Sequence, residues 1–263
     1  MSQSVPNLNH LFQSAQDEGL LSMAALQALN VPDIGAQIQA GLGIPVDDVL
    51  SSEVVLVTMM PDDSGSIRFS GNVQAVRGGH NSVLDALITS QQRDYILAHT
   101  RYLNGEVLFP YCPIAQAVRM TPQNYDPNEG TPLYDQTVVL LGTVLAKSQE
   151  FSDNGVPVRT VTLLITDGAD AHSYRSTAQD VAAIVHDMLR SETHIIAGMG
   201  IDDGSTDFRQ VFRSMGIRDE WILTPGNSDP EIRKAFQVFS QSAVQASQGA
   251  ASFSQSIGGF GTP

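Results

Sequence analysis

The stretch VVLVTMMPDDSGSIRFSG, residues 54–71, decides the fold, because it joins a fully apolar run to a cluster of acids, serines and glycines. Residues 54–60 have the composition of a strand that is buried on both faces. Asp62, Ser64 and Ser66 then occupy alternate positions, and side chains two residues apart in an extended segment point the same way. We therefore expect three oxygen ligands directed at one point beyond the end of this strand.

Strand-like and helix-like runs alternate through most of the chain. The strand patterns cover residues 54–60, 95–102, 106–112, 158–166, 194–201 and 220–225. The helix patterns cover residues 72–91, 132–151, 176–192, 205–217 and 228–248. This alternation predicts an α/β, three-layer Rossmann-like fold, in which helices cover both faces of a mainly parallel sheet. Asn104 and Gly105 form a hairpin signal, so the strand at 106–112 should run antiparallel at one edge.

The two ends of the chain differ from this alternating region. Residues 1–50 contain two helical patterns, 11–30 and 34–43, which predict a short N-terminal helical extension packed on the main domain. Residues 249–263 are rich in Gly and Ser and predict a flexible tail. The main domain should therefore span residues 51–248.

Composition excludes several classes of protein. The 263 residues are 42% hydrophobic, which is enough for a full core, and the formal net charge of -14 opposes binding to nucleic acid or to anionic membranes. Cys112 is the one cysteine, so neither a disulfide framework nor a cysteine-based zinc site is expected. The first residues do not resemble a secretory signal, and no apolar run is long enough to span a bilayer. We expect a cytoplasmic protein with no nucleic-acid or membrane partner.

Two further polar groups follow at positions where ligands gather in parallel sheets, at the carboxyl ends of strands or at helix starts. One is the loop 129–135, and the other is residues 166–168, directly after the apolar strand 158–166. Thr131 and Asp167 would add a hydroxyl and a carboxylate to the first three oxygens. Five hard oxygen ligands without His or Cys favour Mg²⁺, with Mn²⁺ or Ca²⁺ as alternatives. Because only two of the five are charged, the cation should attract a further anionic oxygen.

The order of these motifs resembles a known family. A strand followed by Asp-x-Ser-Gly-Ser, then Gly-Thr-Pro-Leu-Tyr at 130–134 and Ile-Thr-Asp-Gly at 165–168, is similar to the von Willebrand factor A (vWA) domain with an intact metal-ion-dependent adhesion site, or MIDAS. The resemblance covers residues 52–248. It places the metal ligands, without substitution, on Asp62, Ser64, Ser66, Thr131 and Asp167. One departure is Met60-Pro61, where the family more often has a plain apolar strand.

The resemblance implies a metal-dependent protein–protein interaction module, in which an Asp or Glu of a partner completes the coordination of the cation. Intracellular members of the family commonly work beside an AAA+ ATPase or a kinase and phosphatase pair, so we expect a partner of that kind. The Ser-rich segment 235–249 is loosely similar to the last helix of the tellurite-resistance-associated branch.

Two alternatives remain open at the level of sequence. One is a metal-dependent phosphatase or hydrolase, although Ser64 stands where phosphatases of the haloacid-dehalogenase type have a second carboxylate. The other is a scaffold whose binding does not use the metal. Measurable phosphatase turnover, or binding unchanged by loss of Thr131 or Asp167, would favour these alternatives.

Other polar residues have simpler interpretations. The histidines are scattered and fit core or surface positions, and only His172, five residues after Asp167, is a candidate for partner contact. Residues 202–207 predict a turn followed by a helix N-cap rather than a calcium loop. Capping boxes are expected for Ser176 with Gln179 and for Ser228 with Glu231. Core positions are expected for Met59, Met60 and Trp221.

Overall fold

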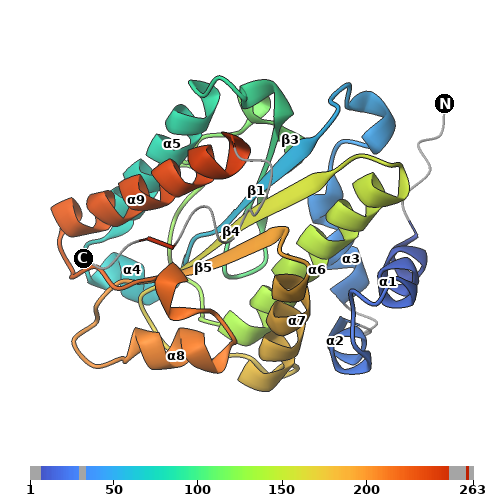
Figure 1. The fold of residues 1–263 in the computed structure, drawn as a ribbon. Helices are drawn as coiled ribbons and strands as arrows, with labels where there is room; N and C mark the ends of the chain where they lie inside the picture. Colours follow the sequence, from blue (N-terminus) through green and yellow to red (C-terminus); the bar gives the residue numbers. More distant parts are fainter. Residues whose placement is uncertain (1–6, 30–33, 249–258, 261–263) are drawn as a thin grey trace.

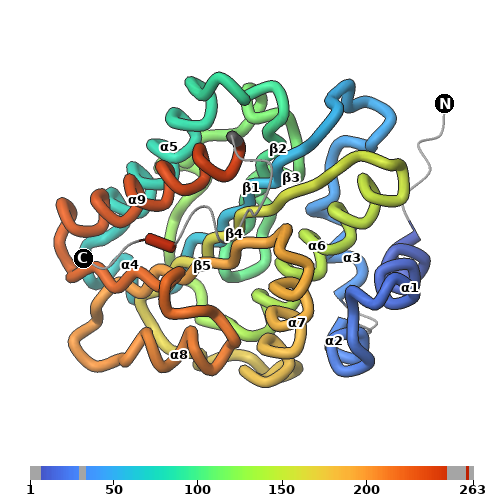
Figure 2. The backbone as a smooth tube through the Cα atoms, viewed as in Figure 1, coloured from blue at the N-terminus to red at the C-terminus, as the bar shows by residue number. Residues whose placement is uncertain are grey.

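In a computed structural model, which describes residues 7–29, 34–248 and 259–260, the chain forms a six-stranded sheet flanked by helices (Figures 1 and 2). The sheet has the strand order β3-β2-β1-β4-β5-β6, and β3 is antiparallel to β2 while the other strands are parallel. The strands are β1 (Val54–Met60), β2 (Ile96–Arg101), β3 (Val107–Pro113), β4 (Val158–Thr166), β5 (His194–Gly200) and β6 (Ile222–Leu223). The predicted fold class and the antiparallel edge strand are confirmed.

The central strands are buried on both faces, which explains their continuous apolar composition. Every residue of β1, β2 and β5 is buried, as are the last seven residues of β4. A sheet of this kind needs a layer of helices on each face. The helices α5 (Val73–Ile88) and α9 (Asp229–Gln248) lie together on one face, and α6 (Leu133–Asp153) and α7 (Ala178–Arg190) lie on the other (Figure 1). The helix α8 (Phe208–Ser214) packs beside β5 and α7.

The N-terminal helices add a further layer outside α6 and α7. They are α1 (Leu8–Asp17), α2 (Met23–Leu29) and α3 (Ile34–Leu42), and their apolar side chains join the main core. As a result, α6 is buried along most of its length. Two buried cations reinforce this layer: Arg101 donates to the carbonyls of Gln37 (3.3 Å) and Gly105 (3.1 Å), and Lys147 donates to the carbonyl of Ile44.

The structure corrects four details of the predicted elements. The expected helix 11–30 is two helices, because Gly19 has a φ of 76° and ends the first. The last strand is two residues long rather than six. The capping box of α7 uses Thr177 and Asp180 instead of Ser176 and Gln179, whereas Ser228 and Glu231 do make contact at the start of α9. The segment after β1 turns into a short helix, α4 (Gly65–Phe69).

Other expectations hold. Met59, Met60 and Trp221 are buried, and Asp207 caps α8 by accepting from the amide of Gln210. The predicted tail, apart from Gly259 and Phe260, lies outside the described residues, and the boundary at residue 50 stays a prediction. None of the described helices is both long and apolar enough to cross a membrane.

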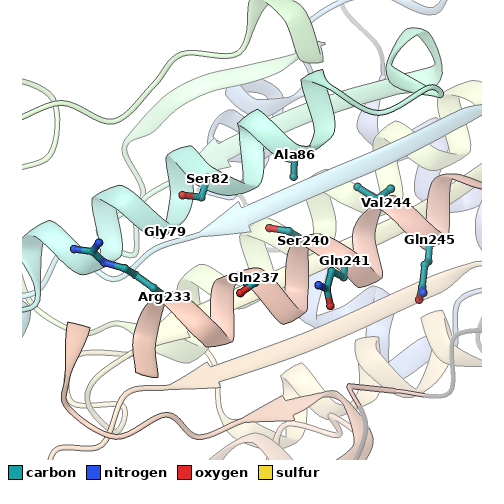
Figure 3. Close-up of a pocket in the computed structure, with 9 residues that line it drawn as sticks. All are labelled: Gly79, Ser82, Ala86, Arg233, Gln237, Ser240, Gln241, Val244 and Gln245. Atoms are coloured by element: carbon teal, nitrogen blue, oxygen red, sulfur yellow. The ribbon is translucent and has the colours of Figure 1, made fainter. Parts of the chain in front are cut away.

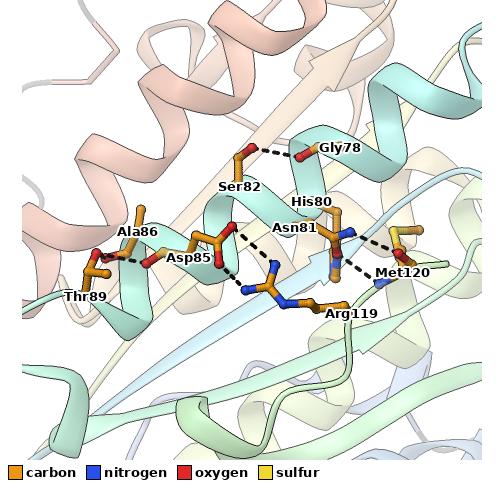
Figure 4. A network of polar contacts seen from close by, with 9 residues as sticks. All are labelled: Gly78, His80, Asn81, Ser82, Asp85, Ala86, Thr89, Arg119 and Met120. Carbon is orange, nitrogen blue, oxygen red and sulfur yellow. Dashed lines mark hydrogen bonds and ion pairs between the residues drawn. The ribbon is translucent and has the colours of Figure 1, made fainter.

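A polar network holds the helix α5 to residues 119–120 (Figure 4). The Asn81 side chain pairs with the backbone of Met120 in both directions, with two hydrogen bonds of 2.9 Å, and Arg119 forms an ion pair with Asp85. His80 lies fully buried beneath this network, where its Nε2 is 3.0 Å from the hydroxyl of Thr100. Burial lowers the pKa of His80 to about 4.

The buried His80 makes a testable contribution to the pH dependence of stability. Because the unfolded chain takes up a proton on this ring below pH 6.5 and the folded chain does not, the contribution is complete above pH 6.5 and is lost as the pH falls toward 4. We expect the difference in the free energy of unfolding between wild type and His80→Gln to shrink by about 2 kcal/mol from pH 7 to pH 5. Urea unfolding followed by circular dichroism measures it, and a constant difference would contradict the assignment.

A groove of about 620 Å³ runs between α5 and α9, and Gly79 of α5 is one of the residues that line it (Figure 3). A Cβ atom at Gly79 would lie 2.0 Å from a ring carbon of the buried Phe236, so only glycine permits this approach. At the neighbouring Gly78, a Cβ atom would meet no heavy atom of the described residues within 4 Å.

These adjacent glycines form a matched pair of substitutions. Gly78→Ala should leave stability unchanged or raise it by up to about 1 kcal/mol, because alanine favours the helix. Gly79→Ala should lower stability by about 1–3 kcal/mol, because the added methyl group overpacks the contact between α5 and α9. Thermal and urea unfolding of both variants measure the difference, and equal stabilities would show that the close approach to Phe236 is absent.

Candidate metal centre

The candidate centre lies where β1 and β4 end side by side. These strands are parallel neighbours, with Met60 paired to Leu164, so the residues that follow them meet at one edge of the sheet. Asp62 comes two residues after β1, and Asp167 follows β4 directly. The strand β1 ends before Pro61, whose carbonyl accepts a hydrogen bond from the amide of Leu103 in the neighbouring loop.

The Asp62 carboxylate is fully buried and joins the two strand ends. Its Oδ1 accepts from the amide of Ser64 at 2.7 Å. Its Oδ2 accepts from the hydroxyl of Thr166 at 2.8 Å and from the amide of Asp167 at 3.3 Å. The Asp62 carbonyl also accepts from the buried hydroxyl of Tyr125 at 2.5 Å. All these donors are neutral, so the negative charge has hydrogen bonds but no counter-ion among them.

Two serine hydroxyls lead from Ser64 to Asp167. The hydroxyls of Ser64 and Ser66 are 2.8 Å apart, and that of Ser66 donates to Oδ1 of Asp167 at 2.5 Å. The other oxygen of Asp167 accepts from Ser70 at 3.1 Å. The sequence-based expectation of an extended segment is wrong beyond Ser64, which is extended and precedes α4, because Ser66 lies in the first turn of that helix. The helical turn nonetheless brings both serine hydroxyls together.

Backbone hydrogen bonds hold the loop that carries Thr131 next to the centre. The carbonyl of Asp63 accepts from the amides of Asn128 (2.9 Å) and Glu129 (3.1 Å), and the amide of Gly65 donates to the carbonyl of Glu129 at 3.1 Å. These bonds hold the loop 128–131 against the residues that follow β1. Thr131 itself is largely buried. The structure thus joins four of the five predicted residues by direct hydrogen bonds and places the fifth on the adjoining loop.

Residues beyond the five predicted ligands organise this centre. Thr166 and Tyr125 orient Asp62, and the side chain of Asp63 accepts from the amide of Asn104 at 3.0 Å. The Nδ1 atom of His172 accepts from the amide of Thr131 at 2.8 Å, so this histidine positions a candidate ligand. Thr166 and Asp63 are adjacent in sequence to the predicted ligands Asp167 and Asp62, so the sequence could have indicated a role for them. Nothing in the sequence marks Tyr125.

A second carboxylate holds the loop that carries His172. Asp135, in the first turn of α6, accepts from the consecutive backbone amides of Tyr174 (3.1 Å), Arg175 (3.1 Å) and Ser176 (2.7 Å). Asp170 accepts from the amide of Tyr134 at 3.2 Å. The loop is therefore fixed to the start of the same helix that follows Thr131.

The electrostatics of the centre suit a bound cation. Burial raises the pKa of Asp62, and burial together with the charge of Asp62 raises the pKa of Asp167 to about 6 and that of Asp63 to about 7. Buried carboxylates close to one another repel, and a cation would relieve that repulsion. In the part of the chain that the structure describes, no three His, Cys, Asp or Glu side chains gather closely enough to hold a metal by themselves. A metal here would need the hydroxyls as ligands.

Large exposed side chains occur on the segments that surround the centre. Phe69, in α4, is 90% exposed, and Tyr174, two residues after His172, is 83% exposed. The guanidinium of Arg175 lies 5.1 Å from the centre of the Tyr174 ring. Arg68, also in α4, forms an ion pair with the exposed Asp126. Aromatic side chains left in solvent are a common feature of interaction surfaces.

Comparisons with known proteins identify the fold. No protein-family model matches the chain, and no curated protein matches its sequence. Among solved structures, the pilus adhesin SpaC from Lactobacillus rhamnosus GG in its open conformation is similar, with a TM-score of 0.54 and 13% identity over 74% of this chain and 30% of that one. The strand order, with its antiparallel edge strand, is that of a vWA-type Rossmann-like fold.

Two other structures resemble the chain less closely. A von Willebrand factor type A protein from Catenulispora acidiphila has a TM-score of 0.44 and 16% identity, covering 74% of this chain and 43% of that one. Proximal thread matrix protein 1 from the mussel byssus, in a form with a zinc-occupied MIDAS motif, has a TM-score of 0.47 and 16% identity, covering 73% and 46%. The chain spans less than half the length of each of these three proteins.

Two threonines of β4 test whether the orientation of Asp62 matters for metal binding. Thr166→Val removes the hydroxyl that donates to Asp62 at nearly constant volume, and we expect Mn²⁺ affinity to fall about tenfold or more, as for other residues that orient metal ligands. Thr162→Val is the control, because the equally buried Thr162 hydroxyl has no hydrogen-bond partner among the described residues. Isothermal titration calorimetry with both folded variants makes the comparison. Equal affinities would show that Asp62 is not oriented by Thr166.

Proposed function

We propose that the chain is a non-enzymatic, metal-dependent protein-binding module with an intact MIDAS. A divalent cation would be held by the two carboxylates of Asp62 and Asp167 and by three hydroxyls, those of Ser64, Ser66 and Thr131. The observation that carries the proposal is the gathering of two buried carboxylates that face only neutral donors: Asp62 accepts from the backbone amide of Ser64, and the hydroxyls of Ser64 and Ser66 lead to Asp167.

The donor set supports Mg²⁺, with Mn²⁺ or Ca²⁺ as alternatives, since all five groups are hard oxygen ligands. Bound here, the cation would supply a Lewis-acidic point of attachment for an anionic oxygen. Because only two of the five groups are charged, the cation would attract a further anionic oxygen, and a partner's Asp or Glu would supply it. The residues around the centre then supply specificity, and the exposed Phe69 and Tyr174 are suited to contact the same partner.

The wider assignments rest on sequence and family resemblance. The net charge of -14 argues against nucleic acid and anionic membranes as partners. The serine-rich α9 supports a place near the tellurite-resistance-associated branch. A cytoplasmic partner such as an AAA+ ATPase or a kinase and phosphatase system follows from the analogy with intracellular members of the family. The absence of a second carboxylate at Ser64 speaks against the phosphatase alternative.

The test is an affinity capture from native cell extract. Wild type in Mg²⁺ is compared with wild type in EDTA, with Asp167→Ala in Mg²⁺, and with Asp126→Ala in Mg²⁺. Asp126→Ala is a suitable control because it also removes one carboxylate, but from an exposed residue whose ion pair is with Arg68 of α4. We expect a specific partner to be retained by wild type and Asp126→Ala in Mg²⁺, and to be lost in the other two samples.

Two outcomes would overturn the proposal. A partner retained in all four samples would assign binding to a surface that does not use the metal, as in the scaffold alternative. Hydrolysis of p-nitrophenyl phosphate that requires Mg²⁺ and disappears in Asp62→Ala would establish the enzymatic alternative.

A further inference from the structure

Gly259 and Phe260, near the end of the chain, lie at the β6 edge of the sheet, opposite the β3 edge (the short dark red piece in Figure 2). The amide of Phe260 donates to the carbonyl of Glu220 at 2.8 Å. The Phe260 ring packs edge-on against Trp221, with ring centres 5.2 Å apart and an angle of 80° between the planes. Glu220 and Trp221 belong to the single turn of 3-10 helix that leads into β6.

Gly259 is fitted closely to this position. Its φ of 79° lies in the left-handed region that favours glycine. A Cβ atom there would lie 2.5 Å from the Cβ of Glu220 and 2.8 Å from its carbonyl oxygen. The glycine thus allows the backbone to approach Glu220 closely enough for the next residue to form its hydrogen bond and its ring contact.

Phe260 also forms one wall of a cavity of about 890 Å³ between the sheet edge and α9. The same cavity is lined by Ile222 and Leu223 of β6, by Ala235 and Val238 of α9, and by charged side chains that include Arg209, Arg213 and Lys234. Because β6 has two residues and pairs only with β5 in the described sheet, its outer side is a free edge. Free edges expose unpaired backbone groups and apolar side chains, and proteins commonly cover them.

We propose that the surface formed by Glu220 and Trp221 at this sheet edge is a binding site for a glycine–aromatic pair, and that the chain's own Gly259–Phe260 is its occupant. The specificity has two parts: the close backbone approach admits glycine, and the edge-on contact with Trp221 selects an aromatic ring after it. The Gly259–Phe260 pair is then an intramolecular ligand at the β6 edge of the sheet. Tethering to the same chain makes occupancy favourable even for a small contact, because it raises the effective concentration of the pair. This inference does not depend on the metal centre.

Trp221 gives the proposal a direct readout, since it is the only tryptophan in the sequence and is 2% exposed. Phe260→Ala removes the ring contact, and Gly259→Val blocks the backbone approach while leaving Phe260 in place. We expect both full-length variants to shift the tryptophan emission to longer wavelength and to increase its quenching by acrylamide, with unchanged far-ultraviolet circular dichroism. Phe253→Ala, which removes another phenylalanine from the C-terminal region, should match wild type.

A rescue experiment separates a binding site from simple packing. The octapeptide SIGGFGTP, residues 256–263, is added in excess to the Phe260→Ala protein, with SIGGAGTP as the control peptide. The first peptide should restore the emission and quenching of wild type in a saturable manner, and the second should not. Three results would overturn the proposal: emission unchanged in Phe260→Ala and Gly259→Val, no rescue by SIGGFGTP, or a concentration-dependent wild-type dimer that Phe260→Ala abolishes, which would place the pair in a second copy.

Discussion

The carboxylate of Asp62, which follows β1, is hydrogen-bonded to the end of the neighbouring strand β4. The candidate metal centre is arranged around these hydrogen bonds. The carboxylate accepts hydrogen bonds from Ser64, the residue just before α4, and from Thr166 and Asp167 at the end of β4. A carboxylate buried without a cation is costly, and the raised pKa of Asp62 reflects that cost. The surrounding donors reduce the cost but leave the charge unbalanced. A cation at this point would stabilise an arrangement that the backbone has already formed.

The rest of the molecule can be understood as support for this edge of the sheet. The loop that carries Thr131 is fixed on one side by Asp63 and on the other by His172, and Asp135 holds the loop of His172 to α6. The helix α6 is itself buried between the sheet and the N-terminal helices. The N-terminal helices therefore contribute to the position of the site without supplying any of its five candidate ligands. Rigid support of this kind favours precise placement of ligand oxygens.

The features that sequence alone could predict are those encoded by local pattern. The bounds of β1 and β4 match the apolar runs residue for residue, and the hairpin at Asn104-Gly105 correctly predicts the antiparallel edge. The short helix α4 was missed because a run of five residues, which includes one serine and one glycine, is too short to show a helical period. Tyr125 and His172 were missed as organising residues because their contacts, with Asp62 and Thr131, span 63 and 41 positions of sequence. Such contacts depend on the folded topology.

The proposed function depends on a divalent cation held by the oxygens that gather at the ends of β1 and β4. Anomalous diffraction from crystals grown with Mn²⁺ tests this most directly. We predict a strong anomalous peak among Ser64, Ser66, Thr131 and Asp167, with Asp62 attached to it directly or through water, and the loss of that peak in Asp167→Ala. Crystals that bind Mn²⁺ only elsewhere, or that show no peak at a saturating concentration, would contradict the proposal.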